Sequence, residues 1–469
     1  MRWREALRPV QMQRVALLAP NDSLRDLLVN VGDEGSVALD GIGADDDAAP
    51  EPRPAAAALQ RLHVSTSAPA LSPVPPDLDR WERDGRIDLI AGEAQLEQQS
   101  AQAFTRDNVC AMTGWMAADD MPKLAHRVAG LGGAVVPMPR PPGVTPPTLL
   151  ADHGAAREFA PLVETYGTVP YADVNPSVLA GLAYVVMFGM MFADVGSGAL
   201  LLLAAIAIRM RWWSRLAPLR EVWWFIAGAG VASMVFGVLY GEFFGPTGVI
   251  PVVWLAPLDG PVTLLAAAIG VGAVLLAGAY ALGSVNRFRE GGWRAAIYAP
   301  SGIAGATLFV GLGAIIGGIW ADLSWVVLLG GGIALAGMTA AYIGLFAAAG
   351  GGGAGAAQAG IDVFDLIMRL GSNLVSFARL AAFGLTHAAL GYVIWQATTA
   401  SADRGPLGVI GAVLIFLVGT AVAFALEALV AAVQALRLEY YELFSRIFDI
   451  EGQPFLPWHV PLTTTEASC

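Results

Sequence analysis

The sequence predicts a mainly α-helical, polytopic membrane domain that follows a small α/β domain. Only 14% of the residues are charged, and the mean hydropathy is +0.58. Most of the acidic residues lie in residues 1–160, including the run Asp45-Asp46-Asp47, whereas Ala, Gly, Leu, Val and Ile dominate residues 177–436. We therefore expect a cytoplasmic α/β domain over 1–160, and a membrane domain with a short C-terminal tail over 161–469.

The N-terminal part contains two strand–helix–strand patterns. In QRVALLAPNDSLRDLLVNVGDEGSVALD (13–40), an apolar strand is followed by Asn21-Asp22-Ser23, which we predict to cap a helix, and then by a second strand. Residues 108–139 repeat this order, with Gly132-Gly133 before the last strand. Between the two patterns we expect a flexible linker at 41–57 and a helical stretch within 75–104. The proline-rich run 138–150 ends the domain, because proline does not continue a helix or a central strand.

Seven apolar stretches follow, and a membrane-spanning helix needs about 20 residues. The stretch 177–208 is too long for one simple crossing, and its middle reads FADVGSG. Cytoplasmic loops are rich in Arg, and RMRWWSRLAPLR, NRFREGGWR and the tail after Leu436 carry Arg, whereas the loop 245–260 has neither Arg nor Lys. These loops fall on one side if 177–208 contributes two short halves, broken near Asp194-Val195-Gly196. We therefore expect eight membrane helices and cytoplasmic termini, with one broken helix at 177–208 as the alternative. The other stretches lie near 220–244, 260–285, 295–320, 323–349, 361–400 and 405–436.

Ionisable residues concentrate in the last two apolar stretches. Arg379 and His387 lie in one, and Glu427, Gln434 and Arg437 lie in the other. An arginine at mid-bilayer costs about 2.5–3.5 kcal/mol on translocon-based scales, so such residues are functional candidates. His387 lies about 12 Å along a helix from Arg379, and Glu427 and Gln434 share a helix face. Polar groups separated in this way indicate a path for an ion or proton.

Each of these residues also has a structural interpretation. Arg379 and Glu427 could form a buried ion pair, although such pairs often do not recover their desolvation energy. His387 could be a hydrogen-bonded core histidine, and Arg437 could extend its side chain to the interface. Asp194 could cap a half-helix and Glu242 could lie at a helix end, so these two are weaker candidates. A standalone transporter or channel that uses Arg379 is a further alternative, although no inverted repeat is visible.

Several function classes are disfavoured. The net charge of −12 argues against nucleic acid as a partner. The first eight residues, MRWREALR, are charged and no apolar h-region follows them, so we expect no signal peptide. No Cys/His cluster has metal-ligand spacing, so we expect neither a metal nor a cofactor. Since no GxxxxGK[ST] loop is present, we do not expect the chain to turn over ATP by itself.

Several motifs together resemble one family over most of 160–460. They are YGTVPYADVNPSVLAG, FGMMFADVGSGALLLL, VFGVLYGEFFG, SFARLAAFGLTHAAL and LEALVAAVQALRLEYYELFSRIFDIEGQPFLPW. In these motifs the chain resembles subunit a, also called subunit I, of the V-type and A-type rotary ATPases. The N-terminal region resembles a shortened form of the family's cytoplasmic arm, because no sustained heptad run is visible.

The resemblance implies a stator subunit in a prokaryotic cell membrane that couples proton or sodium movement to ATP hydrolysis or synthesis. The implied partners are a proteolipid c-ring, peripheral stalk subunits, a central-stalk adaptor subunit and the lipid bilayer. Arg379 would face the ring carboxylate, Ser376 would help to hydrate the site, and Glu427, His387, Gln434 and Arg437 would line half-channels or support Arg379. The sequence leaves the choice between H⁺ and Na⁺ open, and an assembly scaffold that moves no ion is another alternative.

Overall fold

The computed structural model describes residues 9–40, 53–62, 68–150, 155–210, 220, 222–448 and 452–463. The chain divides into two compact units, which we call the sheet unit (Pro9–Leu149 and Gly452–Cys469) and the membrane unit (Met1–Arg8 and Leu150–Glu451). The predicted fold class is confirmed, because the chain is mainly helical, has six long apolar helices and contains a small N-terminal α/β region.

The sheet unit is built on an antiparallel sheet with the strand order β2-β4-β1-β5, and β3 also pairs with β4. Alternate residues of β1, namely Val15, Leu17 and Ala19, are buried in a core shared with α2 and α6, which is the period-two pattern of a half-buried strand. The elements are β1 Met12–Pro20, α2 Leu24–Glu34, β2 Val37–Asp40, α3 Pro54–Leu62, α4 Leu78–Arg83, α5 Ile87–Ala101, β3 Phe104–Arg106, β4 Val109–Ala117, α6 Met121–Ala129 and β5 Ala134–Met138.

Two local predictions in the sheet unit are wrong. Asn21–Ser23 forms a short 3-10 turn without a side-chain cap on α2. The Asn21 side chain instead accepts a hydrogen bond from Cys110 Sγ at 2.6 Å, since the pairing of β1 with β4 brings the two residues together. The predicted linker is partly helical, because α3 begins at Pro54 and its buried Ala55 and Ala58 pack toward α5. The remainder of that linker, 41–52, lies outside the described residues.

The C-terminal tail completes the core of the sheet unit. Val460 is fully buried in the core that contains Val15 and Leu27, and Trp458 and Leu462 pack against that core. The backbone N–H of Trp458 donates to the Val37 carbonyl at 2.9 Å, and further backbone bonds join the tail to Gly32 and Leu71. The sheet unit is therefore assembled from residues at both ends of the chain.

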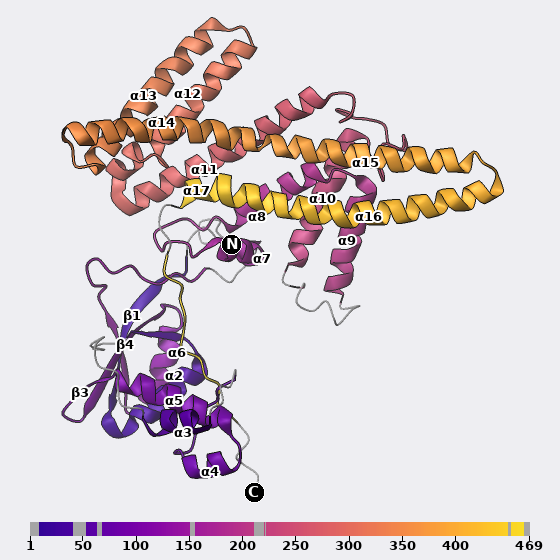
Figure 1. Cartoon of the computed structure of the whole chain (residues 1–469). Coiled ribbons are helices and arrows are strands. Elements are labelled where there is room, and N and C mark those ends of the chain that lie inside the picture. The colour runs from indigo at the N-terminus through magenta and orange to yellow at the C-terminus, as the bar shows by residue number, and fades with distance from the viewer. Residues whose placement is uncertain are drawn as a thin grey trace. The chain divides into compact units, whose positions relative to one another are not determined.

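Among its described residues, the membrane unit contains six helical segments that are long and apolar enough to cross a bilayer, and two shorter apolar helices, α8 and α9. In Figure 1, α15 and α16 run side by side as a long pair, and α12 and α13 form a second hairpin. The elements are α7 Ala155–Tyr166, α8 Ser177–Met191, α9 Val195–Arg209, α10 Trp223–Tyr240, α11 Pro261–Tyr298, α12 Ile303–Trp320, α13 Ser324–Ala348, α14 Gly352–Ser376, α15 Ala378–Ala402, α16 Pro406–Leu438, the π-helix η3 Glu439–Phe444 and α17 Ser445–Ile447.

The break predicted within 177–208 is present, because α8 ends at Met191 and α9 begins at Val195. The predicted loop at 286–294 is much shorter than expected. Helix α11 extends to Tyr298, and its two helical parts meet at a kink at Gly292, whose φ is 67°. Only Phe377 separates α14 from α15, so the two helices form one segment of 51 residues, Gly352–Ala402. Arg379 lies in the first turn of α15, directly after this interruption.

Small residues allow close helix approach in the membrane unit, as is common between membrane helices. A Cβ atom added to Gly237 on α10 would lie 2.5 Å from the backbone nitrogen of Val195. Gly278 on α11 has no other atom within 4 Å of the position where its Cβ would lie. The first glycine is therefore required by packing and the second is not.

We expect Gly237→Ala to lower the thermal stability of the detergent-purified chain and Gly278→Ala to preserve it. The first change forces backbone apart, which corresponds to overpacking at about 1–3 kcal/mol. The second changes only helix propensity, worth at most about 1 kcal/mol. Unfolding temperatures of the two variants test this directly, and equal behaviour would contradict the packing role of Gly237.

Candidate functional site

Asp194 is fixed where α9 begins. One carboxylate oxygen, Oδ1, accepts a hydrogen bond from the Ser197 backbone N–H at 2.6 Å, so Asp194 caps α9. The other oxygen, Oδ2, accepts from the Gly245 backbone N–H at 2.8 Å. Asp194 is fully buried. Its two hydrogen bonds therefore connect the break between α8 and α9 to the segment that follows α10.

Glu242 lies just beyond the end of α10. Gly241 adopts a φ of 73° and ends the helix, as glycine often does. The Glu242 carbonyl accepts from the Val195 N–H at 3.1 Å, which brings this segment against the start of α9. The Glu242 side chain is only 2% exposed. Neither of its carboxyl oxygens has a hydrogen-bond partner among the described residues.

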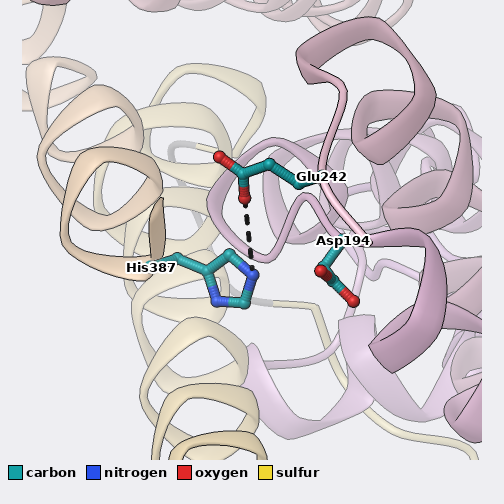
Figure 2. Close-up of side chains that lie close together, drawn as sticks. All are labelled: Asp194, Glu242 and His387. Carbon is teal, nitrogen blue, oxygen red and sulfur yellow. Dashed lines mark ion pairs between the residues drawn. The ribbon is translucent and has the colours of Figure 1, made fainter. Parts of the chain in front are cut away.

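His387 on α15 meets both of these segments and α16. Its Nδ1 forms a short hydrogen bond with Glu427 Oε2, and its Nε2 lies 3.8 Å from Glu242 Oε2. Figure 2 shows the carboxyl groups of Asp194 and Glu242 beside the imidazole ring. We call Asp194, Glu242, His387 and Glu427 the acid–histidine cluster. From the sequence, Asp194 and Glu242 are weaker candidates than His387, but the fold brings all three together.

A small cavity adjoins the acid–histidine cluster. Its volume is about 20 Å³, and Asp194, His387 and Glu427 contribute to its lining together with Ser197 and Thr420. A cavity of this size holds about one water molecule. The site therefore has room for a single water beside three polar side chains, and is too small for an organic substrate.

Arg379 lies one level away from this cluster. Arg379 precedes His387 by eight residues on α15, which is about 12 Å along the helix axis. Because α15 and α16 are antiparallel neighbours, Arg379 lies near the level of Gln434 on α16. Arg379 Nη1 and Gln434 Oε1 are both buried and lack hydrogen-bond partners among the described residues. Glu427 contacts His387, and no ion pair joins Arg379 to Glu427 in the described part of the chain. The structural interpretation of Arg379 as the partner of Glu427 is therefore not supported.

A second set of polar residues is centred on Glu442 in η3. This buried carboxyl lies beside the Ser376 hydroxyl and within electrostatic range of Arg379, Arg437 and Arg446. We call these five residues the arginine-rich cluster. The sequence analysis included Ser376, Arg379 and Arg437 but missed Glu442 and Arg446 as site residues. The spacing in LEYYELFSR was a usable signal, because residues four apart lie on one helix face. The π-helix is a further signal, since such segments often occur at functional sites.

A third buried acid, Asp173, precedes α8 and is outside the spanning helices. Burial, together with the neighbouring carboxyl of Glu290, raises the pKa of Asp173 to about 8. Since this pKa is raised, Asp173 stabilises the fold most at low pH, and that contribution declines as the pH rises toward 8. The Asn286 side chain forms two hydrogen bonds in the same region. It accepts one from the Val174 N–H at 3.0 Å and donates one to the Ile447 carbonyl at 3.3 Å. We interpret this group as a structural connection of α8, α11 and α17.

The fold and the site define a polytopic membrane protein with ionisable side chains buried between its helices. Residues 101–250 match the model of the V-type ATPase 116kDa subunit family. The chain is 27% identical to the A-type ATP synthase subunit I of Aeropyrum pernix over 64% of this chain and 50% of that protein. It is 24% identical to the Methanocaldococcus jannaschii protein of that name over 81% of this chain and 59% of the relative. It is also 35% identical to V-type ATP synthase subunit I 2 of Treponema pallidum over 24% of each chain.

The chain is thus similar to proteins of the V/A-type ATPase subunit I family, at 24–27% identity over 64–81% of its residues. It spans about half the length of the curated archaeal relatives that it matches over most of its residues. This similarity agrees with the resemblance found in the sequence motifs.

Proposed function

We propose that this chain is the membrane stator subunit of a V/A-type rotary ATPase and that it moves an ion between two offset half-channels. The observation that carries the proposal is Arg379, whose buried Nη1 has no partner among the described residues. Arginine remains charged at physiological pH, so this nitrogen could receive a further anion in addition to the electrostatic interaction of Arg379 with Glu442. A carboxylate on a rotating proteolipid ring would supply that anion.

The acid–histidine cluster and the Glu442 carboxyl support the proposed half-channels because they lie on opposite sides of Arg379 along the helices. The acid–histidine cluster lies about 12 Å along α15 in one direction. The arginine-rich cluster extends the other way, since Glu442 follows Gln434 by eight residues on the helix that faces Arg379. A fixed cation favours the ionised form of a carboxylate only where the two groups meet. Arg379 would thus release the proton of an arriving ring carboxyl and prevent direct leakage between the two paths.

We also propose that the sheet unit is cytoplasmic together with the tail. Supporting this, residues 452–463 pack with the N-terminal sheet in one unit, so the membrane is crossed an even number of times between them. Six long segments plus α8 and α9 satisfy this condition. The arginine-rich loops then face the cytoplasm. In this orientation the acid–histidine cluster, next to the loop 245–260, belongs to the outer half-channel, and Glu442 belongs to the inner one.

The energetic coupling follows from the charge moved. Each elementary charge that crosses the membrane potential changes the free energy by about 2.3 kcal/mol per 100 mV. Several such steps per ATP would allow either synthesis or hydrolysis in partner subunits. The proposed partners are the proteolipid ring, the peripheral stalk and the adaptor between ring and central stalk.

Co-purification tests the stator proposal against a standalone transporter. We expect an affinity-tagged chain, extracted in mild detergent, to retain a proteolipid ring and soluble ATPase subunits in fixed stoichiometry. A tagged polytopic membrane protein of unrelated fold, extracted in parallel, controls for nonspecific recovery of proteolipid. Recovery of the chain alone, in an extract where the rest of the ATPase remains assembled, would overturn the proposal.

A further inference from the structure

We propose that Asp194, Glu242 and His387 form a binding site for one transition-metal ion of the Zn²⁺ class, and that the bound ion closes this path. Only the second part rests on the proposed function. The sequence does not indicate a metal site, because its donors are not close together along the chain. These three donors come instead from the start of α9, the end of α10 and the middle of α15.

The positions of the donor atoms suit a small ion. One ligand atom from each of the three side chains lies within 4.8 Å of the others, and all three residues are buried. Zinc bonds of about 2.0–2.1 Å in a tetrahedral arrangement place ligand atoms about 3.4 Å apart. His387 Nε2 and Glu242 Oε2 are 3.8 Å apart. Small movements of the side chains would therefore complete the coordination.

Outer hydrogen bonds already orient two of the ligands. Glu427 binds His387 Nδ1, so the imidazole places its proton there and keeps the Nε2 lone pair toward the two carboxylates. This carboxylate–histidine arrangement is the usual outer shell of a zinc-bound histidine. Backbone N–H groups of Ser197 and Gly245 hold the Asp194 carboxylate. The site thus has directed ligands before any ion arrives.

Charge and unsatisfied polar atoms also point to a cation. Both carboxyl oxygens of Glu242 and Nε2 of His387 lack hydrogen-bond partners among the described residues. Buried charges are costly unless they are paired or coordinate a metal. A divalent ion would neutralise Asp194 and Glu242 together. The adjoining cavity of about 20 Å³ is lined by Asp194 and His387 but not by Glu242, and it could hold one water beside those two residues as the fourth ligand.

The donor set favours zinc-like ions over Ca²⁺ and Mg²⁺. Imidazole suits Zn²⁺, Cu²⁺ and Ni²⁺, whereas Ca²⁺ requires six to eight oxygen ligands. Mg²⁺ usually retains several waters, for which this cavity has no room. Bound Zn²⁺ would occupy His387 Nε2 and the two carboxylates, which are the groups that would otherwise accept protons in the outer half-channel.

Metal binding is tested with the full-length chain in detergent, titrated with Zn²⁺ by calorimetry. We expect the wild type to bind Zn²⁺ at one tight site per chain. Loss of an outer hydrogen-bond partner typically lowers metal affinity about 10–100-fold. Glu242→Gln and His387→Ala should each lower the Zn²⁺ affinity by more than this. Glu427→Gln, which removes only the outer partner of His387, should fall within that range. His459→Ala, at a histidine of the sheet unit, is the matched control and should bind like the wild type. Thermal unfolding of each variant identifies any that fail to fold, and Glu242→Gln conserves the side-chain shape.

Two results would overturn the site: no stoichiometric binding by the wild type, or folded Glu242→Gln and His387→Ala variants that bind as tightly as it does. Blocking is measured with wild-type vesicles in which the outer face is exposed to Zn²⁺. Inhibition that a chelator reverses supports closure of the path. Stoichiometric binding without inhibition overturns closure and leaves the metal site established, whereas failure of the stator proposal itself is detected separately through Arg379.

Discussion

Replacing Arg379 with alanine is expected to reduce ATP-driven ion uptake into membrane vesicles to background while the subunit still assembles. The reason is that Arg379, whose buried Nη1 has no hydrogen-bond partner among the described residues, lies between the acid–histidine cluster and Glu442 along the helices. Without it, a ring carboxylate exposed to this low-dielectric site would remain protonated, because burial favours the neutral acid. The ring would carry its ion past the stator without release, and uptake would cease.

The matched experiment compares Arg379→Lys, Arg379→Ala and Arg404→Ala. Arg404 is an exposed arginine in the turn between α15 and α16, so its loss should leave uptake unchanged. Lysine retains the charge but lacks the forked guanidinium, so we expect ion uptake by the Arg379→Lys variant to fall well below that of the wild type. Immunoblots of the assembled complex accompany each measurement. Full uptake by an assembled Arg379→Ala complex would refute ion transfer through Arg379, and would favour an assembly scaffold.

Deleting residues 452–469 is expected to unfold the sheet unit or leave it marginally stable. The deletion removes the fully buried Val460, the partly buried Trp458 and Leu462, and several backbone hydrogen bonds. Burial of one valine contributes about 1.5–3 kcal/mol, and each hydrogen bond about 0.5–1.5 kcal/mol. The summed loss of roughly 4 kcal/mol or more is large beside the about 5–15 kcal/mol that stabilises a typical domain.

Limited proteolysis of the full chain in detergent measures this effect, with cleavage within residues 9–149 as the readout. Two point variants separate packing from chain length. Val460→Ala should increase cleavage, whereas Leu456→Ala, at a side chain that is 74% exposed, should leave it unchanged. Wild-type protease resistance after the deletion would show that the tail is dispensable for the sheet unit.

The sequence predicted those features that depend on local pattern. The break before Asp194 was visible because a polar FADVGSG interrupts an apolar run, and the last helices were visible from their length. The strands around Val15 and Met112 followed from apolar runs bounded by turn residues. Local rules succeeded only in part at 286–294, where charged residues and two glycines indicated a loop: the backbone is non-helical at Gly292 but helical on both sides of it.

Contacts between distant segments could not be predicted from the sequence. Nothing near Glu242 in the chain indicates that a backbone bond to Val195 and the approach of α15 bring it beside His387. The pairing of Glu427 with His387, rather than with Arg379, depends on the register of α15 against α16. The position of Val460 in the sheet core depends on a return of the chain after the entire membrane unit. The register between two helices or strands is decided by how their side chains pack, and the sequence pattern of one segment alone carries no information about that packing.

The place of Val460 in that core has a consequence for synthesis. Roughly 300 residues separate the last strand of the sheet from the tail that completes its core. At about 5–20 residues per second on the ribosome, the N-terminal domain waits some tens of seconds for its final core residue. During that interval the core that contains Leu27 and Met112 lacks Val460. Completion of this domain would therefore wait until residues 155–448, with the helices described above, have been made.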